Sequence, residues 1–108
     1  MEIKCHFCGQ TFDGDTTELF HSAYCKAQVS EVVADHIITT LSDRSLWVLV
    51  RKYKLARVIK RKYDGEVYRK EWISREVADH VSTISDRALW RLVTRYKLLG
   101  LVRRKYDI

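Results

Sequence analysis

Three cysteines and one histidine near the start of the chain are spaced as ligands for a metal ion. They form the pattern Cys5-x2-Cys8-x12-His21-x3-Cys25. Thiolate and imidazole groups are the ligands of structural zinc sites, which hold the ion in a tetrahedron. Two thiolates in a tight turn would take one edge of the tetrahedron, and a His and a Cys four apart on one helix face would take the other. We expect these four residues to bind one zinc ion.

Two other readings of these side chains stay open. The cysteines could be free thiols in a reducing compartment, and His6, inside the turn, is a further imidazole. Four protein ligands leave no position for water, so we expect a structural rather than a catalytic metal. The sequence has no nucleophile–base pair and no phosphate-binding loop, so we expect no enzyme activity.

The ligand spacing resembles that of C2H2-type zinc fingers, with the last histidine replaced by cysteine. The resemblance covers about 25 residues and implies a small ββα fold, with Phe12 as its buried aromatic and a helix over residues 16–25. In that family the base-reading helix positions correspond to Gly14, Thr17 and Phe20. None is basic, and acidic residues surround them. We expect this segment to fold the N-terminus or to contact a protein partner.

The rest of the chain is an internal repeat. Residues 33–64 read VADHIITTLSDRSLWVLVRKYKLARVIKRKYD, and residues 77–107 read VADHVSTISDRALWRLVTRYKLLGLVRRKYD. The copies align throughout if one residue before Leu41 is extra in the first. A repeated sequence predicts that each copy forms the same fold and carries a similar binding surface.

Each copy carries signals for two helices. Ser30 and Ser74 are expected to cap the first helix, and Ser42 and Ser85 the second. Apolar residues then recur at helical spacing. They are Leu46, Leu49, Val50 and Tyr53 in the first copy, and Leu89, Leu92, Val93 and Tyr96 in the second.

A strand is expected after each second helix, at residues 57–63 and 101–107. Gly100 is expected to end the second helix of the second copy. Asp64-Gly65 favours a tight hairpin turn, which predicts a return strand over residues 66–73. Each copy would then read helix–turn–helix–strand.

The segment from Ser85 to Val102 looks like the recognition helix and first wing strand of winged helix-turn-helix proteins, with Ile84 as the apolar residue of the turn. The resemblance implies an α+β fold, mainly α. Its parts would be a ββα zinc finger (1–26) and two winged-helix-like units with a helix-turn-helix and a β-hairpin (27–65 and 66–108). It also implies that the second helix of each unit enters the DNA major groove.

The residues expected to contact DNA lie on those helices and on the wings. In the first copy they are Arg44, Trp47, Arg51, Lys52, Lys60, Arg61, Lys62 and Arg69. In the second copy they are Arg87, Trp90, Arg91, Thr94, Arg95, Arg103, Arg104 and Lys105. The tryptophans have an alternative role in packing.

Charge supports an anionic partner. Residues 1–43 carry a net charge of −5 and residues 44–108 one of +11. A polyanion such as nucleic acid would be attracted to the second part. No run approaches the roughly 18 apolar residues of a membrane span, and we expect an intracellular protein of the cytoplasm, nucleoid or nucleus.

The sequence thus predicts a sequence-specific or general double-stranded DNA-binding protein that regulates transcription and holds a structural zinc ion. The alternative is a protein-interaction module built on winged-helix repeats. The last strand has no return strand, so we expect it to pair either with a second copy of the chain, as a homodimer, or with the first hairpin. RNA binding is less favoured, because no aromatic-rich sheet is evident.

Overall fold

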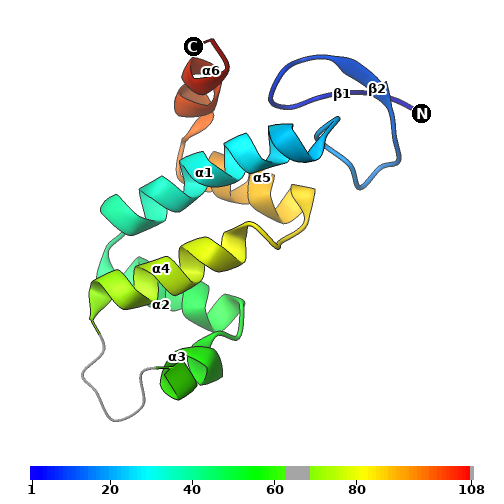
Figure 1. Ribbon diagram of the computed structural model, residues 1–108. Helices are drawn as coiled ribbons and strands as arrows, with labels where there is room; N and C mark the ends of the chain where they lie inside the picture. The colour runs from blue at the N-terminus through cyan, green and yellow to red at the C-terminus, as the bar shows by residue number, and fades with distance from the viewer. Residues whose placement is uncertain (63–68, 108) are drawn as a thin grey trace. The chain divides into compact units, whose positions relative to one another are not determined.

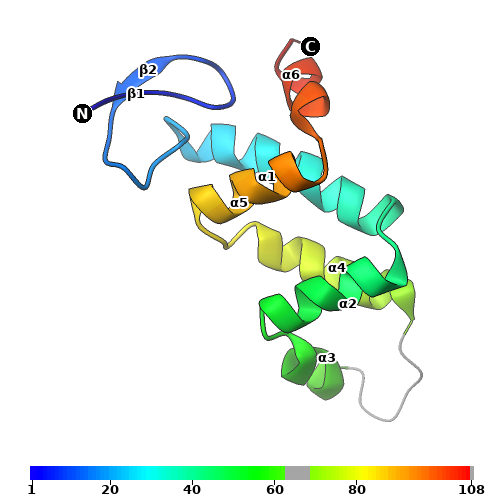
Figure 2. The same ribbon diagram turned by 180° about the vertical axis from the view of Figure 1, so that it is seen from behind.

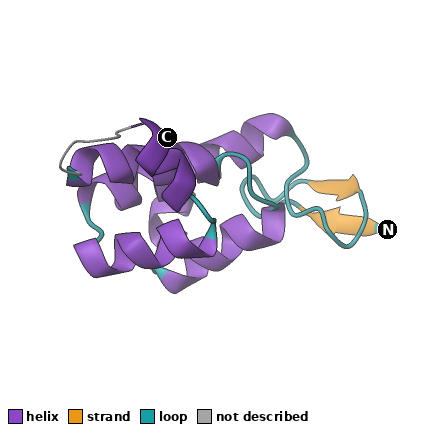
Figure 3. Cartoon of the chain, turned by 90° about the horizontal axis from the view of Figure 1, so that it is seen from below, coloured by secondary structure: helices purple, strands orange, loops and turns teal. Residues whose placement is uncertain are grey.

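The computed structural model describes residues 1–62 and 69–107, which are mainly helical with one small sheet (Figures 1 and 3). The elements are β1 Glu2–Lys4, β2 Thr11–Asp13, α1 Ala23–Thr39, α2 Asp43–Lys52, α3 Ala56–Lys62, α4 Lys70–Val81, α5 Asp86–Arg95 and α6 Leu99–Asp107. A mainly helical α+β chain was expected, and this much is confirmed.

The chain forms two compact units, each of which takes helices from both copies of the repeat. Unit 1 comprises Met1–Val33 and Ser82–Ile108, and unit 2 comprises Ala34–Val81. Unit 1 therefore holds the sheet, the start of α1, α5 and α6, whereas unit 2 holds the end of α1, α2, α3 and α4. These units divide the chain at positions other than the boundaries expected after residues 26 and 65.

Helix α1 is longer than expected and begins elsewhere. Ser30 lies inside it, is 6 % exposed, and donates its hydroxyl to the Lys26 carbonyl over 2.9 Å. Ser74 is fully buried inside α4 and donates to the Lys70 carbonyl over 2.7 Å. The expectation that these serines cap helices is wrong. A serine hydroxyl inside a helix can donate a hydrogen bond to the carbonyl four residues earlier. The presence of a serine alone therefore does not mark the start of a helix.

The caps expected for the second helices are confirmed. Ser42 accepts a hydrogen bond from the Ser45 N–H, and Ser85 accepts one from the Ala88 N–H, each over 3.2 Å. Both caps have extended backbones, as N-cap residues do. The apolar stripes that follow are buried as expected, apart from the tyrosines, which are half-buried.

Both second helices end in the same way, although not at the expected glycine. Lys54 and Lys97 occupy matching positions and have φ values of 56° and 55°. The next residue in each copy, Leu55 or Leu98, donates its N–H back to a carbonyl five residues earlier, the pattern of a Schellman cap. Gly100 instead lies within α6. The prediction for Gly100 is wrong, and its counterpart Arg57 needs no special freedom because it too is helical.

The segments expected to be wing strands are helices α3 and α6 (Figure 2, where α3 follows α2 after a short turn). Each is anchored by two buried residues four apart, Leu55 and Ile59 in one copy and Leu98 and Val102 in the other. In a strand, Arg57 and Gly100, midway between these pairs, would share the buried face, whereas a helix turns them away from it; both residues are exposed. Within the described residues, the winged-helix prediction is therefore wrong for these segments.

Two further expectations depended on those strands. Residues 70–73 of the expected return strand belong to α4, and the Asp64-Gly65 turn lies outside the described residues. Residues 101–107 belong to α6, so the C-terminal strand that suggested a homodimer does not form. The reason for expecting a strand-paired dimer therefore falls away.

Unit 2 joins helices from the two copies directly. Helix α2 packs against α4. The Tyr53 and His80 rings lie 4.9 Å apart, and Lys62 forms a 2.5 Å ion pair with Glu76. The buried apolar residues of this unit are Ile37, Leu41, Leu46, Leu49, Val50, Leu55, Ile59, Ile73, Val77, Ala78 and Val81. Helix α2 thus packs against a helix of the other copy, and α3 is joined to that helix by an ion pair.

Candidate metal centre and nucleic-acid interface

The four expected metal ligands lie together in unit 1. The ligand atoms of Cys5, Cys8, His21 and Cys25 are all within 4.8 Å of one another. His21 Nδ1 is 3.3 Å from both Cys8 Sγ and Cys25 Sγ. In a tetrahedral zinc site, bond lengths of about 2.3 Å to sulfur and 2.0–2.1 Å to nitrogen place these atoms about 3.5 Å apart. The four residues are therefore close enough to hold one metal ion, and their donor set suits zinc.

A tight turn presents the first two cysteines. Strand β1 leads into Cys5, which donates its N–H to the Gln10 carbonyl over 2.9 Å. Gly9 donates to the Cys5 carbonyl over 3.0 Å and has a φ of +77°. A side chain at residue 9 would be strained in this left-handed conformation. Strands β1 and β2 pair Ile3 with Phe12, which closes the loop that carries both thiols.

The second pair of ligands is held by the start of α1. Ser22 Oγ accepts the Cys25 N–H over 3.2 Å, which caps the helix that begins at Ala23. Cys25 lies in its first turn and His21 lies before it. The expected helix over residues 16–25 is therefore wrong, and His21 and Cys25 do not share a helix face. The capping serine places His21 where the chain enters the helix.

The thiols differ in their acidity. Burial by itself raises the pKa of Cys5, but hydrogen bonds to the Cys8 backbone and to His21 outweigh it and bring the pKa to about 6. Burial raises the pKa of Cys25 to about 11, with a contribution from the neighbouring Cys5. Bringing thiolates together without a cation is unfavourable, and a divalent metal would remove that penalty.

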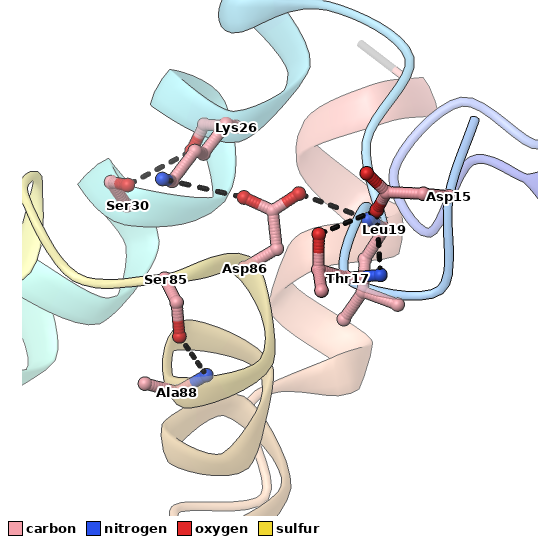
Figure 4. A network of polar contacts seen from close by, with 8 residues as sticks. All are labelled: Asp15, Thr17, Leu19, Lys26, Ser30, Ser85, Asp86 and Ala88. Carbon is pink, nitrogen blue, oxygen red and sulfur yellow. Dashed lines mark hydrogen bonds and ion pairs between the residues drawn. The ribbon is translucent and has the colours of Figure 1, made fainter.

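Two side chains at the start of α5 contact residues 1–26, which we call the metal-binding segment. Asp86 accepts the Leu19 N–H over 2.9 Å and forms a 3.3 Å ion pair with Lys26 (Figure 4). Arg87 donates twice to the Thr16 carbonyl, from Nε over 3.2 Å and from a terminal nitrogen over 2.6 Å. The segment around the metal site is thus docked on the second copy of the repeat.

Aromatic rings complete that contact. The His6 ring lies 4.8 Å from the Trp90 ring and nearly perpendicular to it, at 80°. The buried Phe20 ring lies 6.3 Å from Trp90. His6 thus packs on a tryptophan and is not one of the four clustered ligands. The sequence offered no signal for these contacts, because they join residues 84 and 70 positions apart.

The expected DNA-contacting residues of the first copy lie in unit 2. None of them belongs to the buried apolar stripe of α2. On α2, the side chains of Arg44, Arg51 and Lys52 are exposed, and Trp47 is half-buried. On α3, Lys60, Arg61 and Lys62 are exposed. Arg69 precedes α4, with its guanidinium 5.2 Å from the Trp72 ring.

The expected DNA-contacting residues of the second copy lie in unit 1. Arg87, Arg91, Thr94 and Arg95 are exposed on α5, and Trp90 is half-buried. On α6, Arg103 and Arg104 are exposed, and Lys105 forms a 3.1 Å ion pair with Glu31. Arg87 and Trp90 contact the metal-binding segment, whereas Arg44, the counterpart of Arg87, makes no such contact within the described residues.

Comparisons with known proteins give no relative. No family model matches the chain, and neither the curated proteins nor the solved structures contain a significant match. No helix in the described part of the chain is long and apolar enough to cross a membrane.

Proposed function

We propose that this protein binds double-stranded DNA, with helix α2 as the reading element and a zinc ion as a structural support. The observation that carries the proposal is the charge on α2 and α3. Between residues 43 and 62 there are eight basic residues and one acidic residue, and all eight basic side chains are exposed. Such a density of exposed positive charge suits a phosphate backbone.

The arrangement around α2 supports a reading role. Within unit 2, the end of α1, a turn over residues 40–42 and α2 form a helix–turn–helix, with Leu41 buried in the turn. Arg44, Val48 and Arg51 are exposed at intervals of four and three residues, so they share one face. Arginines there could bind guanine edges, and exposed Val48 could contact a thymine methyl group.

The basic residues on α3 and those at the C-terminal end of α2 would contact phosphates. Lys52 and Lys54 lie at the end of α2, and Lys60 and Arg61 lie on α3. Phosphate contacts would position the protein without reading sequence. A protein of this kind would act as a transcription regulator in the nucleoid or nucleus, without enzyme activity.

The zinc ion would fold the N-terminal segment. Four protein ligands leave no open coordination position, which is the arrangement of structural zinc. The segment lies against α5, so metal binding would stabilise unit 1 as a whole.

The test is binding to a blunt, mixed-sequence duplex at several salt concentrations, followed by fluorescence anisotropy. We expect binding at ~50 mM salt that weakens steeply as salt rises. The double variant Arg44→Ala/Arg51→Ala should bind more weakly and lower the slope of log K against log salt by up to about 1.8. Lys4→Ala/Arg75→Ala removes the same charge from exposed positions outside α2 and α3 and should change little.

Absence of duplex binding at ~50 mM salt would overturn the proposal. Equal losses of duplex affinity in the two double variants would show that only the net charge of the protein matters. The proposed role of α2 in reading DNA would then be wrong. The alternative, a protein-interaction module, is favoured by the exposed acidic residues Asp13, Asp15 and Glu18 of the metal-binding segment. Under it, capture of a basic partner would depend on those residues and not on Arg44.

A further inference from the structure

A groove in unit 1 lies where the metal-binding segment meets α5. Its volume is about 520 Å³, and it is lined by His6, Leu19, Arg87, Trp90, Arg91, Thr94 and Arg95. That volume falls within the usual range for small-molecule sites, about 300–1,000 Å³. The groove therefore has room for a ligand and is built from residues of two distant parts of the chain.

The lining combines an aromatic wall with a cationic one. Trp90 is held by His6 and Phe20, so its indole has a fixed position. Arg87, Arg91 and Arg95 follow one another at intervals of four residues along α5 and share its face. A fixed ring beside aligned guanidinium groups suits a ligand that is both planar and anionic.

The arginines differ in their availability. Arg87 uses two N–H groups on the Thr16 carbonyl, which fixes its guanidinium at the edge of the groove. Arg91 and Arg95 are exposed, and neither has an ion-pair partner among the residues that the structure describes. The two outer arginines can therefore bind an anion without breaking an existing ion pair.

We propose that this groove binds one unpaired nucleotide, with its base stacked on Trp90 and its phosphate held by Arg91 and Arg95. A base inside a duplex is stacked on its neighbours and cannot reach an indole in a groove, whereas an unpaired base can. The same chemistry is present in a free mononucleotide and in the unpaired end of a DNA strand. This site is separate from the duplex-binding surface proposed for α2 and α3.

The first copy of the repeat provides a comparison within the same chain. Trp47 corresponds to Trp90, but Val48 stands where the second copy has Arg91. The first copy therefore lacks an arginine directly after its tryptophan. We expect the nucleotide to bind beside Trp90 and not beside Trp47.

The experiment uses the zinc-loaded chain with Trp47→Phe and Trp72→Phe, which leaves Trp90 as the only tryptophan. Titration with deoxyadenosine monophosphate should quench its fluorescence. Deoxyribose 5-phosphate lacks the base and should bind about 5- to 150-fold more weakly, the range for loss of one base–aromatic stack. A duplex with a single-stranded overhang should compete with the mononucleotide better than a blunt duplex if the strand end is the natural source. If the free mononucleotide is the source, the two duplexes should compete equally and weakly.

Arg91→Gln tests the site without touching a packed residue. It should weaken mononucleotide binding about 10-fold or more, as expected for a lost charge-assisted hydrogen bond. It should weaken binding of the blunt duplex less than Arg51→Gln does, because the proposed duplex surface lies on α2 and α3. Arg51→Gln is the matched control on α2 and should have the reverse effect, so failure of the groove and failure of the duplex surface are distinguishable.

Three results would overturn the inference. The first is no quenching of Trp90 by the mononucleotide at up to ~10 mM. The second is unchanged mononucleotide binding in Arg91→Gln. The third is tighter binding of a phosphotyrosine peptide than of any nucleotide, which would assign the groove to a protein ligand.

Discussion

The contrast between Asp86 and Asp43 allows a sharp test of how the metal-binding segment is attached. The two aspartates occupy the same position in the two copies, the first residue of α5 and of α2. The Asp86 side chain is 16 % exposed and contacts both Leu19 and Lys26. The Asp43 side chain is 79 % exposed and contacts Lys70 at 3.4 Å.

The expected effect of each alanine substitution follows from these contacts. Both Asp86→Ala and Asp43→Ala lose the favourable interaction with a helix N-terminus, worth about 0.3–1 kcal/mol. Asp43→Ala also loses a surface ion pair, worth about 0–1 kcal/mol. Asp86→Ala loses a similar ion pair and, in addition, a carboxylate hydrogen bond to a backbone N–H, worth about 1.5–3 kcal/mol. We expect Asp86→Ala to destabilise the protein by about 1.5–3 kcal/mol more than Asp43→Ala.

Urea denaturation of the zinc-loaded protein measures this difference. The background with Trp90 as the only tryptophan reports on unit 1, and a Trp90→Phe background reports on unit 2 through Trp47 and Trp72. Asp86→Ala should lower the midpoint seen by Trp90, and Asp43→Ala should scarcely change it. Equal effects of the two substitutions on Trp90 would refute the reasoning, because they would mean that contacts with Leu19 and Lys26 contribute nothing.

Four further outcomes are expected. Elemental analysis of protein purified without chelator should find one zinc per chain, and Cys25→Ala should abolish it and unfold the N-terminal segment; zinc-free protein with an unchanged near-ultraviolet spectrum would contradict this. Ser85→Ala should lower the free energy of unfolding by about 0.5–2 kcal/mol, measured in urea, because α5 loses its cap, whereas Ser85→Asp should restore most of it. Lys97→Gly should leave the free energy of unfolding unchanged or raise it by up to about 1 kcal/mol, measured by thermal unfolding, because the φ of residue 97 is positive. Arg51→Gly, in the last turn of α2, should lower the free energy of unfolding. Burial lowers the pKa of His36 below its ordinary value, so the fold favours the neutral ring. The contribution of His36 to stability should be complete above the pKa of His36 in the unfolded chain and should fall as the pH drops through that pKa. The free energies of unfolding of the wild type and of His36→Asn should be measured at pH 7.5 and at pH 5.5. The difference between them should shift in favour of the variant at the lower pH.

The sequence by itself determined the features that depend on local spacing. Three cysteines and one histidine, spaced as two close pairs, predicted a metal cluster, because each pair needs only a turn or the start of a helix to bring its atoms together. Ser42 and Ser85 predicted helix starts, because a cap acts within three residues. The apolar stripes of α2 and α5 predicted which faces are buried. DNA contact remains a prediction from charge and helix pattern.

Tertiary structure decided the features for which local signals conflict or are silent. Ser30 resembles a cap in sequence, but burial between packed helices lets it bond within α1 instead. The β-branched residues of RVIKRKY favour a strand locally. Only a helix, however, buries Leu55 and Ile59 while leaving Arg57, midway between them, exposed. The groove beside Trp90 depends on contacts between residues more than 60 positions apart, such as Leu19 with Asp86. No spacing in the sequence encodes such a contact, because it exists only once the N-terminal segment and α5 have packed against each other.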